Sequence, residues 1–126
     1  MKALLIGVPD AAAKLAEYLR AQGVEAEIAE PAGTGETEIA LLAHELTHLE
    51  TMLGGQRPDA VVLADAGDRA LAGALVATKL LIPVAAVDDS QGRNRELLAH
   101  LADRILPADG GEIAAWIAAP PKLPRP

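Results

Sequence analysis

Aspartates recur directly after short apolar runs in this chain, where α/β proteins commonly place their reactive groups. Five of them share this position: Asp10, Asp65, Asp68, Asp88 and Asp89. Such carboxylates can transfer protons or bind a hard cation such as Mg²⁺. Lys and Arg, which a phosphate site needs, are scarce beside them, and Arg69 is the nearest. Three interpretations stay open: a Mg²⁺ site, a remodelled ligand site that has lost its preference for anions, and helix N-caps (Asp10 and Asp68 above all) with solvated loop charge, which we favour.

A second pattern, HELTH at 44–48, has the histidine spacing of zinc-dependent proteases. Histidines four residues apart lie on one face of a helix and can chelate a metal. The apolar stripe of the same helix is made of leucines: Leu42, Leu46, Leu49 and Leu53. His44 and His48 lie on the opposite side, so we expect both imidazoles to face water. A catalytic zinc site needs a shielded cavity and a third ligand, and we therefore predict no metal site here.

The elements that must position these residues alternate between strands and helices. Apolar runs predict strands over 3–8, 24–30, 60–64, 82–87 and 104–106. Helical spacing predicts helices over 10–23, 37–53, 68–81, 93–102 and 112–118. The second helix is expected to stop at Gly54-Gly55. Strands separated by helices imply a parallel sheet with right-handed crossovers, so we predict a doubly wound, Rossmann-like α/β fold with five strands in the order 2-1-3-4-5 and helices on both faces.

Three loops of this fold, 7–10, 65–68 and 88–90, are expected to meet at the carboxyl edge of the sheet, where ligands bind in such folds. Gly7 belongs to the first loop and is predicted to be a packing residue at the end of a strand. A single domain over 1–118 is expected, followed by a tail over 119–126 that holds four of the nine prolines.

Composition excludes several classes of function. The absence of cysteine excludes disulfides, thiolate metal sites and cysteine nucleophiles. A net charge of −7, with one Trp, one Tyr and no Phe, argues against nucleic-acid binding. No apolar run reaches the ~20 residues of a membrane span, and no signal peptide is recognisable. We therefore expect a cytoplasmic protein that binds neither nucleic acid nor membranes.

The second half of the chain resembles a known family. Residues 57–89, RPDAVVLADAGDRALAGALVATKLLIPVAAVDD, are similar to part of the N-terminal domain of the non-hydrolysing UDP-N-acetylglucosamine 2-epimerases, a GT-B-like Rossmann half. There a strand leads into a Gly-Asp-Thr loop, an Ala-rich helix and an Ile-Pro-Val strand. NRELLAHLAD at 94–103 resembles the helix that follows, and the opening GVPDAAAKLAEYLRAQG is a weaker match.

The resemblance carries over the family's catalytic residues only in part. Ala66 stands where the family has its catalytic aspartate, and Asp65 could replace it through a one-residue shift of the loop. Asp88 stands in the place of a family glutamate, followed by Asp89 and Ser90 in place of Ala-Gly. The opening arginine and a second glutamate of the family have no counterpart. The family's second domain, which binds most of the UDP, is not among these 126 residues.

The resemblance implies Asp65 and Asp88 as candidate catalytic residues. The candidate ligand-binding residues are Gly7, Asp10, Asp68, Asp89 and Ser90. No cofactor is implied apart from the Mg²⁺ considered above. We favour a stand-alone epimerase-like domain that is not catalytic alone and acts as a binding or interaction module. The alternative is one subunit of a two-chain nucleotide-sugar epimerase, isomerase or transferase, so whether the chain is an enzyme stays open. The expected partners are a nucleotide sugar, a second copy of the chain, or a separate protein that supplies the second domain.

Overall fold

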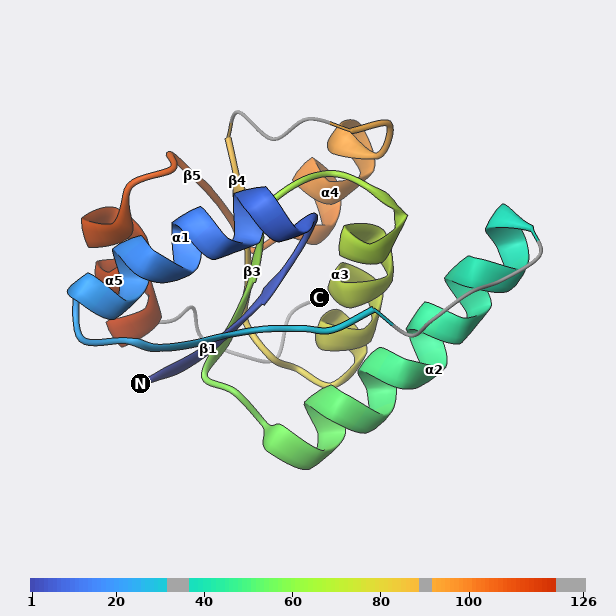
Figure 1. The fold of residues 1–126 in the computed structure, drawn as a ribbon, viewed down its shortest axis with the longest axis horizontal. Coiled ribbons are helices and arrows are strands. Elements are labelled where there is room, and N and C mark those ends of the chain that lie inside the picture. The colour runs from blue at the N-terminus through green and yellow to red at the C-terminus, as the bar shows by residue number, and fades with distance from the viewer. Residues whose placement is uncertain (32–36, 89–91, 120–126) are drawn as a thin grey trace.

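The computed structural model describes residues 1–31, 37–88 and 92–119. Their strands and helices alternate along the whole chain (Figure 1). The strands are β1 (Lys2–Ile6), β2 (Glu25–Ile28), β3 (Ala60–Leu63), β4 (Val84–Val87) and β5 (Arg104–Leu106). The helices are α1 (Pro9–Ala21), α2 (Glu38–Gln56), α3 (Asp68–Lys79), α4 (Arg95–Leu101) and α5 (Gly110–Ala118). All strand pairs are parallel and the order is β2-β1-β3-β4-β5, which confirms the predicted fold class and topology.

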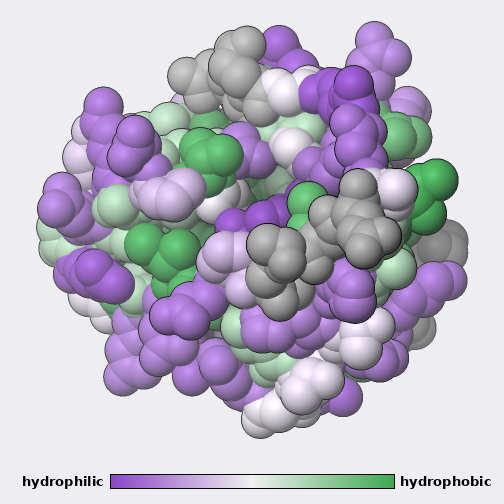
Figure 2. All heavy atoms as spheres, turned by 45° about the vertical axis from the view of Figure 1, so that its right-hand side comes forward, coloured by the Kyte–Doolittle hydropathy of each residue, from purple (hydrophilic) through white to green (hydrophobic). Residues whose placement is uncertain are grey.

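Helices cover both faces of the sheet, so the fold has three layers. Alternate residues of a strand point to opposite faces, and Leu4 and Ile6 of β1 pack toward α2, α3 and α4. Ala3 and Leu5 pack toward α1 and α5. Because both faces are covered, β3 and β4 are buried throughout, which explains their uninterrupted apolar sequences. The surface seen over α2 and α3 is mostly hydrophilic, with apolar side chains in small separate patches (Figure 2).

The predicted end of α2 is wrong by three residues, whereas the other predicted bounds agree with the structure to within two. The helix continues through Gly54 and Gly55 to Gln56. Each glycine costs a helix about 1 kcal/mol, which the packing of the rest of α2 overrides. The helix ends where Arg57 takes a left-handed conformation, with φ of 47°, and Pro58 follows. Of the predicted tail over 119–126, residues 120–126 lie outside the described residues.

The predicted helix caps at Asp10 and Asp68 are also wrong. Val8 is the N-cap of α1 and Gly67 is the N-cap of α3, so both aspartates lie inside the first turn of their helices. Pro9 explains the earlier start of α1, since its fixed φ suits the first helical position. Both carboxylates still carry negative charge near a helix N-terminus, where it is favourable.

Candidate functional site

The candidate site is the carboxyl edge of the sheet, where the loops after β1, β3 and β4 lie. The topology brings the predicted residues of the described chain to this edge: Gly7, Asp10, Asp65, Asp68 and Asp88. Asp89 and Ser90 lie outside the described residues. The carboxylates at this edge differ in burial, because Asp10 and Asp88 are exposed whereas Asp65 is 9% exposed.

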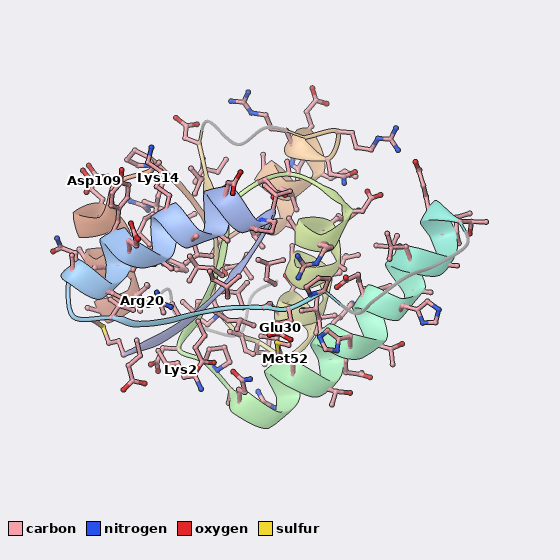
Figure 3. All side chains as sticks on the ribbon, in the orientation of Figure 1. Lys2, Lys14, Arg20, Glu30, Met52 and Asp109 are labelled. Carbon is pink, nitrogen blue, oxygen red and sulfur yellow. The ribbon has the colours of Figure 1, made fainter. Side chains whose placement is uncertain are left out.

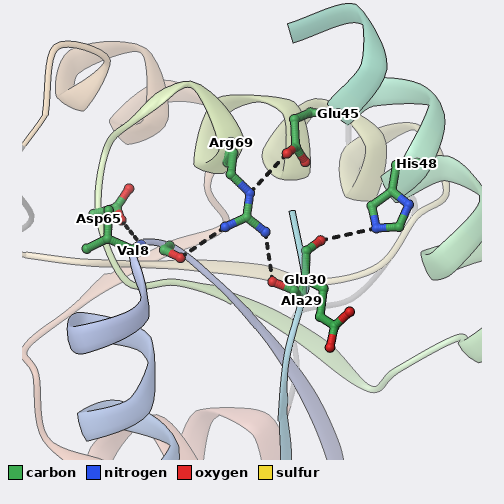
Figure 4. Close-up of polar contacts among 8 residues, drawn as sticks. Val8, Ala29, Glu30, Glu45, His48, Asp65 and Arg69 are labelled. Atoms are coloured by element: carbon green, nitrogen blue, oxygen red, sulfur yellow. Dashed lines mark hydrogen bonds and ion pairs between the residues drawn. The ribbon is translucent and has the colours of Figure 1, made fainter. Parts of the chain in front are cut away.

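The Asp65 carboxylate faces inward and binds backbone. Its Oδ2 atom accepts a short hydrogen bond from the Val8 N–H (Figure 4), and its Oδ1 atom accepts one from the Gly67 N–H at 2.9 Å. A Cβ atom on Gly7 would lie 2.8 Å from Oδ2, so the carboxylate requires glycine there. Asp65 therefore links the loop after β1 to the loop after β3. Gly7 is the packing residue that the sequence predicts.

Arg69, in the first turn of α3, connects the ends of β1 and β2. Its Nη1 atom donates to the Gly7 carbonyl at 3.2 Å and its Nη2 atom donates to the Ala29 carbonyl, just past β2, at 2.7 Å. Its Nε atom lies 3.2 Å from Oε1 of Glu45 on α2, a carboxylate that is only 1% exposed (Figure 4). The guanidinium group therefore ties α2 and α3 to the ends of β1 and β2.

Sequence reasoning did not identify Glu45 as a buried residue, although a signal was present. Glu45 precedes Leu49 and Leu53 at intervals of four residues, and these are the three buried residues of α2. Positions at this spacing share one helix face. A carboxylate on the buried face of a helix indicates that a neighbouring element provides a cation, and here Arg69 of α3 forms the ion pair.

The histidines of α2 do not form a metal centre with a third ligand in the described part of the chain. His44 is exposed, as expected, but His48 is only partly exposed and its Nε2 atom lies 3.1 Å from the Glu30 carbonyl oxygen. Among the residues that the structure describes, no three His, Asp or Glu side chains converge to hold a metal. The same residues contain no helix long and apolar enough to span a bilayer.

Asp68 binds the start of α4. Its Oδ1 atom accepts a hydrogen bond from Nδ2 of Asn94 at 2.8 Å, and the Asn94 N–H donates to the Ala66 carbonyl at 3.0 Å. Gly92 has φ of 141°, and a Cβ atom there would lie 2.4 Å from the Ala66 backbone. The loop after β3 and the segment before α4 are therefore tightly joined. Asp68 is a predicted site residue, whereas Gly92 and Asn94 are not.

Two hollows flank the carboxyl end of β4. The first, of about 360 Å³, has an apolar floor and a charged rim of Asp88, Arg95 and Glu96. Nη2 of Arg95 donates to the Asp88 carbonyl at 2.9 Å. The second, of about 270 Å³, lies beside α1 and includes Lys14 and Tyr18. Figure 3 shows Lys14 on the side of α1 where α5 begins.

Lys14 and Tyr18 lie on α1, outside the loops from which the sequence predicts the site. Ala11, Lys14, Leu15 and Tyr18 recur at the three- and four-residue spacing of one helix face, which is the available signal. Within the described chain, the groups at this edge that can meet a ligand include the exposed Asp10 and Asp88 carboxylates, together with Lys14 and Arg95 in the hollows. This set can bind a polar or anionic molecule and offers carboxylates for proton transfer.

Solved structures share this fold. The UDP-GlcNAc 2-epimerase of Methanocaldococcus jannaschii superposes with a TM-score of 0.69 and 23% identity, over 95% of this chain and 43% of that one. A structure of the enzyme from the same organism in complex with UDP-GlcNAc and UDP gives 0.66 and 26%, over 81% and 39%. The Neisseria meningitidis enzyme bound to UDP-GlcNAc gives 0.66 and 16%, over 81% and 39%.

No protein-family model and no curated protein matches the chain. The chain spans only about two fifths of the length of the structures that it resembles. Their likeness confirms the resemblance stated from residues 57–89, at the level of the fold. The chain therefore has the fold of part of a UDP-GlcNAc 2-epimerase, with a coverage consistent with its N-terminal half.

Proposed function

We propose that this chain is an epimerase-like domain that does not turn over a nucleotide sugar by itself and acts as a binding module. The observation that supports this function is the orientation of the Asp65 carboxylate. Ala66 stands where the resemblance puts the catalytic aspartate, and both oxygens of the neighbouring Asp65 bind backbone N–H groups. A general base must reach the proton that it removes, whereas this carboxylate is turned into the protein.

The ligand class that the resemblance favours is a nucleotide sugar. The Methanocaldococcus and Neisseria enzymes bind UDP-GlcNAc. In this chain, the two hollows beside Val87 offer space at the matching edge of the sheet, and each includes one cation, Arg95 or Lys14. A pyrophosphate group binds cations of this kind, and apolar floors suit the rings of the ligand.

A two-chain enzyme is the second candidate function, and Asp88 favours it. Its carboxylate is exposed at the rim of the larger hollow, where a substrate held by another chain could reach it. The partner would be a separate protein that supplies the second domain. A second copy of this chain is the other partner that the fold permits, since closed dimers are the commonest assemblies of soluble proteins.

The first test is an amide NMR titration of the whole chain with UDP-GlcNAc, with and without Mg²⁺. We expect saturable shifts at residues 10, 68 and 87–88 and around the two hollows. Arg95→Gln should weaken binding, whereas Arg104→Gln, at an exposed position of β5, should leave it unchanged. An absence of shifts at millimolar ligand would refute nucleotide-sugar binding by the isolated chain.

A turnover assay separates the two candidate functions. We expect no epimerisation of UDP-GlcNAc by the chain alone, and turnover by the chain alone would refute the non-catalytic role. Turnover that appears only after addition of a separately produced second domain of an epimerase would favour the two-chain enzyme. In that case Asp88→Asn should abolish the turnover of the mixture. Glu96→Gln at the same rim serves as the control and should leave the turnover unchanged.

A further inference from the structure

One peptide group, Gly7–Val8, joins β1 to α1 and has both of its polar atoms bonded inside the protein. Its N–H, on Val8, donates to Oδ2 of Asp65. Its C=O, on Gly7, accepts from Nη1 of Arg69 at 3.2 Å. Figure 4 shows the two side chains approaching this peptide from different elements. Rotation of the peptide plane would break both hydrogen bonds, so its orientation is fixed.

The surroundings of Asp65 are shaped to hold a carboxylate. A Cβ atom on Gly7 would lie 2.8 Å from Oδ2, and one on Gly67 would lie 3.2 Å from Oδ1. Two glycines thus leave the space that the carboxylate fills, and two N–H groups point into that space. Asp65 is 9% exposed, in contrast to the exposed Asp10 at the same edge.

We propose that the Asp65 carboxylate is an internal anion that closes the turn after β1 against phosphate groups. N–H groups at a turn from a strand to a helix are the donors that phosphates use in many α/β proteins. Here those of Val8 and Gly67 already donate to a carboxylate, and Arg69 holds the Gly7–Val8 peptide in the orientation that serves it. A phosphate at this turn would have to displace a buried negative charge that remains nearby and repels it.

The inference does not rest on the proposed function, because it concerns any phosphate group and this turn alone. It has a consequence for that function, however. A phosphorylated ligand that binds at this edge should contact Lys14 or Arg95 in the hollows and leave the Val8 and Gly67 amides unchanged.

The test is a titration of the whole chain with inorganic phosphate, followed by the amide signals of Val8 and Gly67. In the natural sequence we expect no saturable shift of either signal. In Asp65→Ala both N–H groups lose their acceptor, and we expect saturable shifts with at least about a tenfold gain in phosphate affinity, the size of one charge-assisted hydrogen bond. Asp10→Ala is the matched control, because it removes the same charge at the same edge and leaves the turn closed.

Three outcomes of the phosphate titration would overturn the inference. They are a saturable phosphate shift of Val8 in the natural sequence, a folded Asp65→Ala protein that gains no phosphate binding, and an equal gain in Asp10→Ala. Should Asp65→Ala fail to fold, Asp65→Asn is used in the same way, since its single amide oxygen keeps the shape of the side chain and loses the charge. Slow hydrogen exchange of the Val8 amide in the natural sequence is expected as well, and fast exchange would contradict the closed turn.

Discussion

At the level of single residues, Arg69 connects the ends of β1 and β2 to α2 and α3 beside the candidate site. Its planar guanidinium group donates hydrogen bonds to the Gly7 and Ala29 carbonyls and forms an ion pair with Glu45. The burial of Glu45 would cost more without this partner, because a buried carboxylate has lost its hydration. The Arg69–Glu45 pair therefore connects α2 to the site, although neither residue needs to contact a ligand.

Replacement of Arg69 by lysine tests this role. Arg69→Lys keeps the charge, but a lysine cannot reach two carbonyls and a carboxylate in the same geometry. We expect a loss of about 2 kcal/mol in the free energy of unfolding, as for the loss of hydrogen bonds from a charged group to buried acceptors. Urea unfolding followed by circular dichroism measures it.

The matched control is Arg93→Lys. Arg93 forms an ion pair with Glu38 at 3.0 Å, but both side chains are largely exposed, at 68% and 77%. Exposed pairs contribute little, so this variant should stay within about 0.5 kcal/mol of the natural sequence. Equal losses in the two variants would mean that the contacts of Arg69 have no special weight.

The sequence predicts that Asp65 lies at the carboxyl edge of the sheet, but it does not predict the orientation of the Asp65 carboxylate. Its position follows from the end of β3, which an apolar run predicts. Its orientation depends on Val8, which lies 57 residues earlier and comes close only in the folded sheet. The acidic side chains of this edge look alike in the sequence, and only packing separates the buried Asp65 from the exposed Asp88.

At the level of elements, the glycines in helices have two different roles. Gly54 lies inside α2, and beyond its neighbours and the backbone of its own helix no atom lies within 4 Å of the place where its Cβ would be. Gly73 lies inside α3, and a Cβ atom there would come within 2.3 Å of Cδ1 of Ile6. Ile6 is fully buried, so it has little room to move. Gly73 therefore permits α3 to approach the sheet closely, whereas Gly54 serves no packing contact.

Substitution of each glycine by alanine separates these roles. Gly54→Ala should raise the free energy of unfolding by about 0.5–1 kcal/mol, because alanine favours the helix and meets nothing. Gly73→Ala gains the same helix propensity but overfills the core, which costs ~1–3 kcal/mol. We expect Gly73→Ala to be the less stable by at least about 1 kcal/mol in urea unfolding. A Gly73→Ala protein as stable as Gly54→Ala would refute the close packing of α3.

The order of the strands could be predicted because buried parallel strands carry a plain signal. The runs 60–64 and 82–87 are apolar throughout, and β3 and β4 are buried on both faces. Helix ends could not be predicted as well. Asp10 is a residue type that favours the N-cap position, but α1 begins one residue earlier, at Pro9. Gly54 is typical of a helix end, but α2 continues past it to Gln56. The end of a helix depends on one or two residues, and a neighbouring residue can set it in place of the predicted one.

At the level of the whole molecule, charge opposes folding whereas the two core layers favour it. The sheet is covered by apolar side chains on both faces. The chain carries 18 acidic and 11 basic residues, and the acidic ones lie largely at the surface. An excess of like charges repels itself in the compact state and is relieved when the chain expands. The ion pairs Lys2–Glu27 and Arg93–Glu38 are solvent-accessible and offset little of this repulsion.

Salt should therefore stabilise this protein. Mobile ions at ~0.3 M screen charges that lie more than several ångströms apart, whereas the buried Arg69–Glu45 pair is screened much less. We expect the melting temperature to rise by roughly 2–5 °C between about 0.01 and 0.3 M NaCl, equivalent to ~0.5–1 kcal/mol, in thermal unfolding followed by circular dichroism. A matched variant lowers the net charge from −7 to −3 by replacing four exposed glutamates with glutamine: Glu17, Glu25, Glu50 and Glu112. Its melting temperature should be higher than that of the natural sequence at low salt and should respond less to NaCl. An equal response of the two proteins would show that salt acts through something other than the net charge, and a fall in melting temperature would mean that specific ion pairs outweigh the general repulsion.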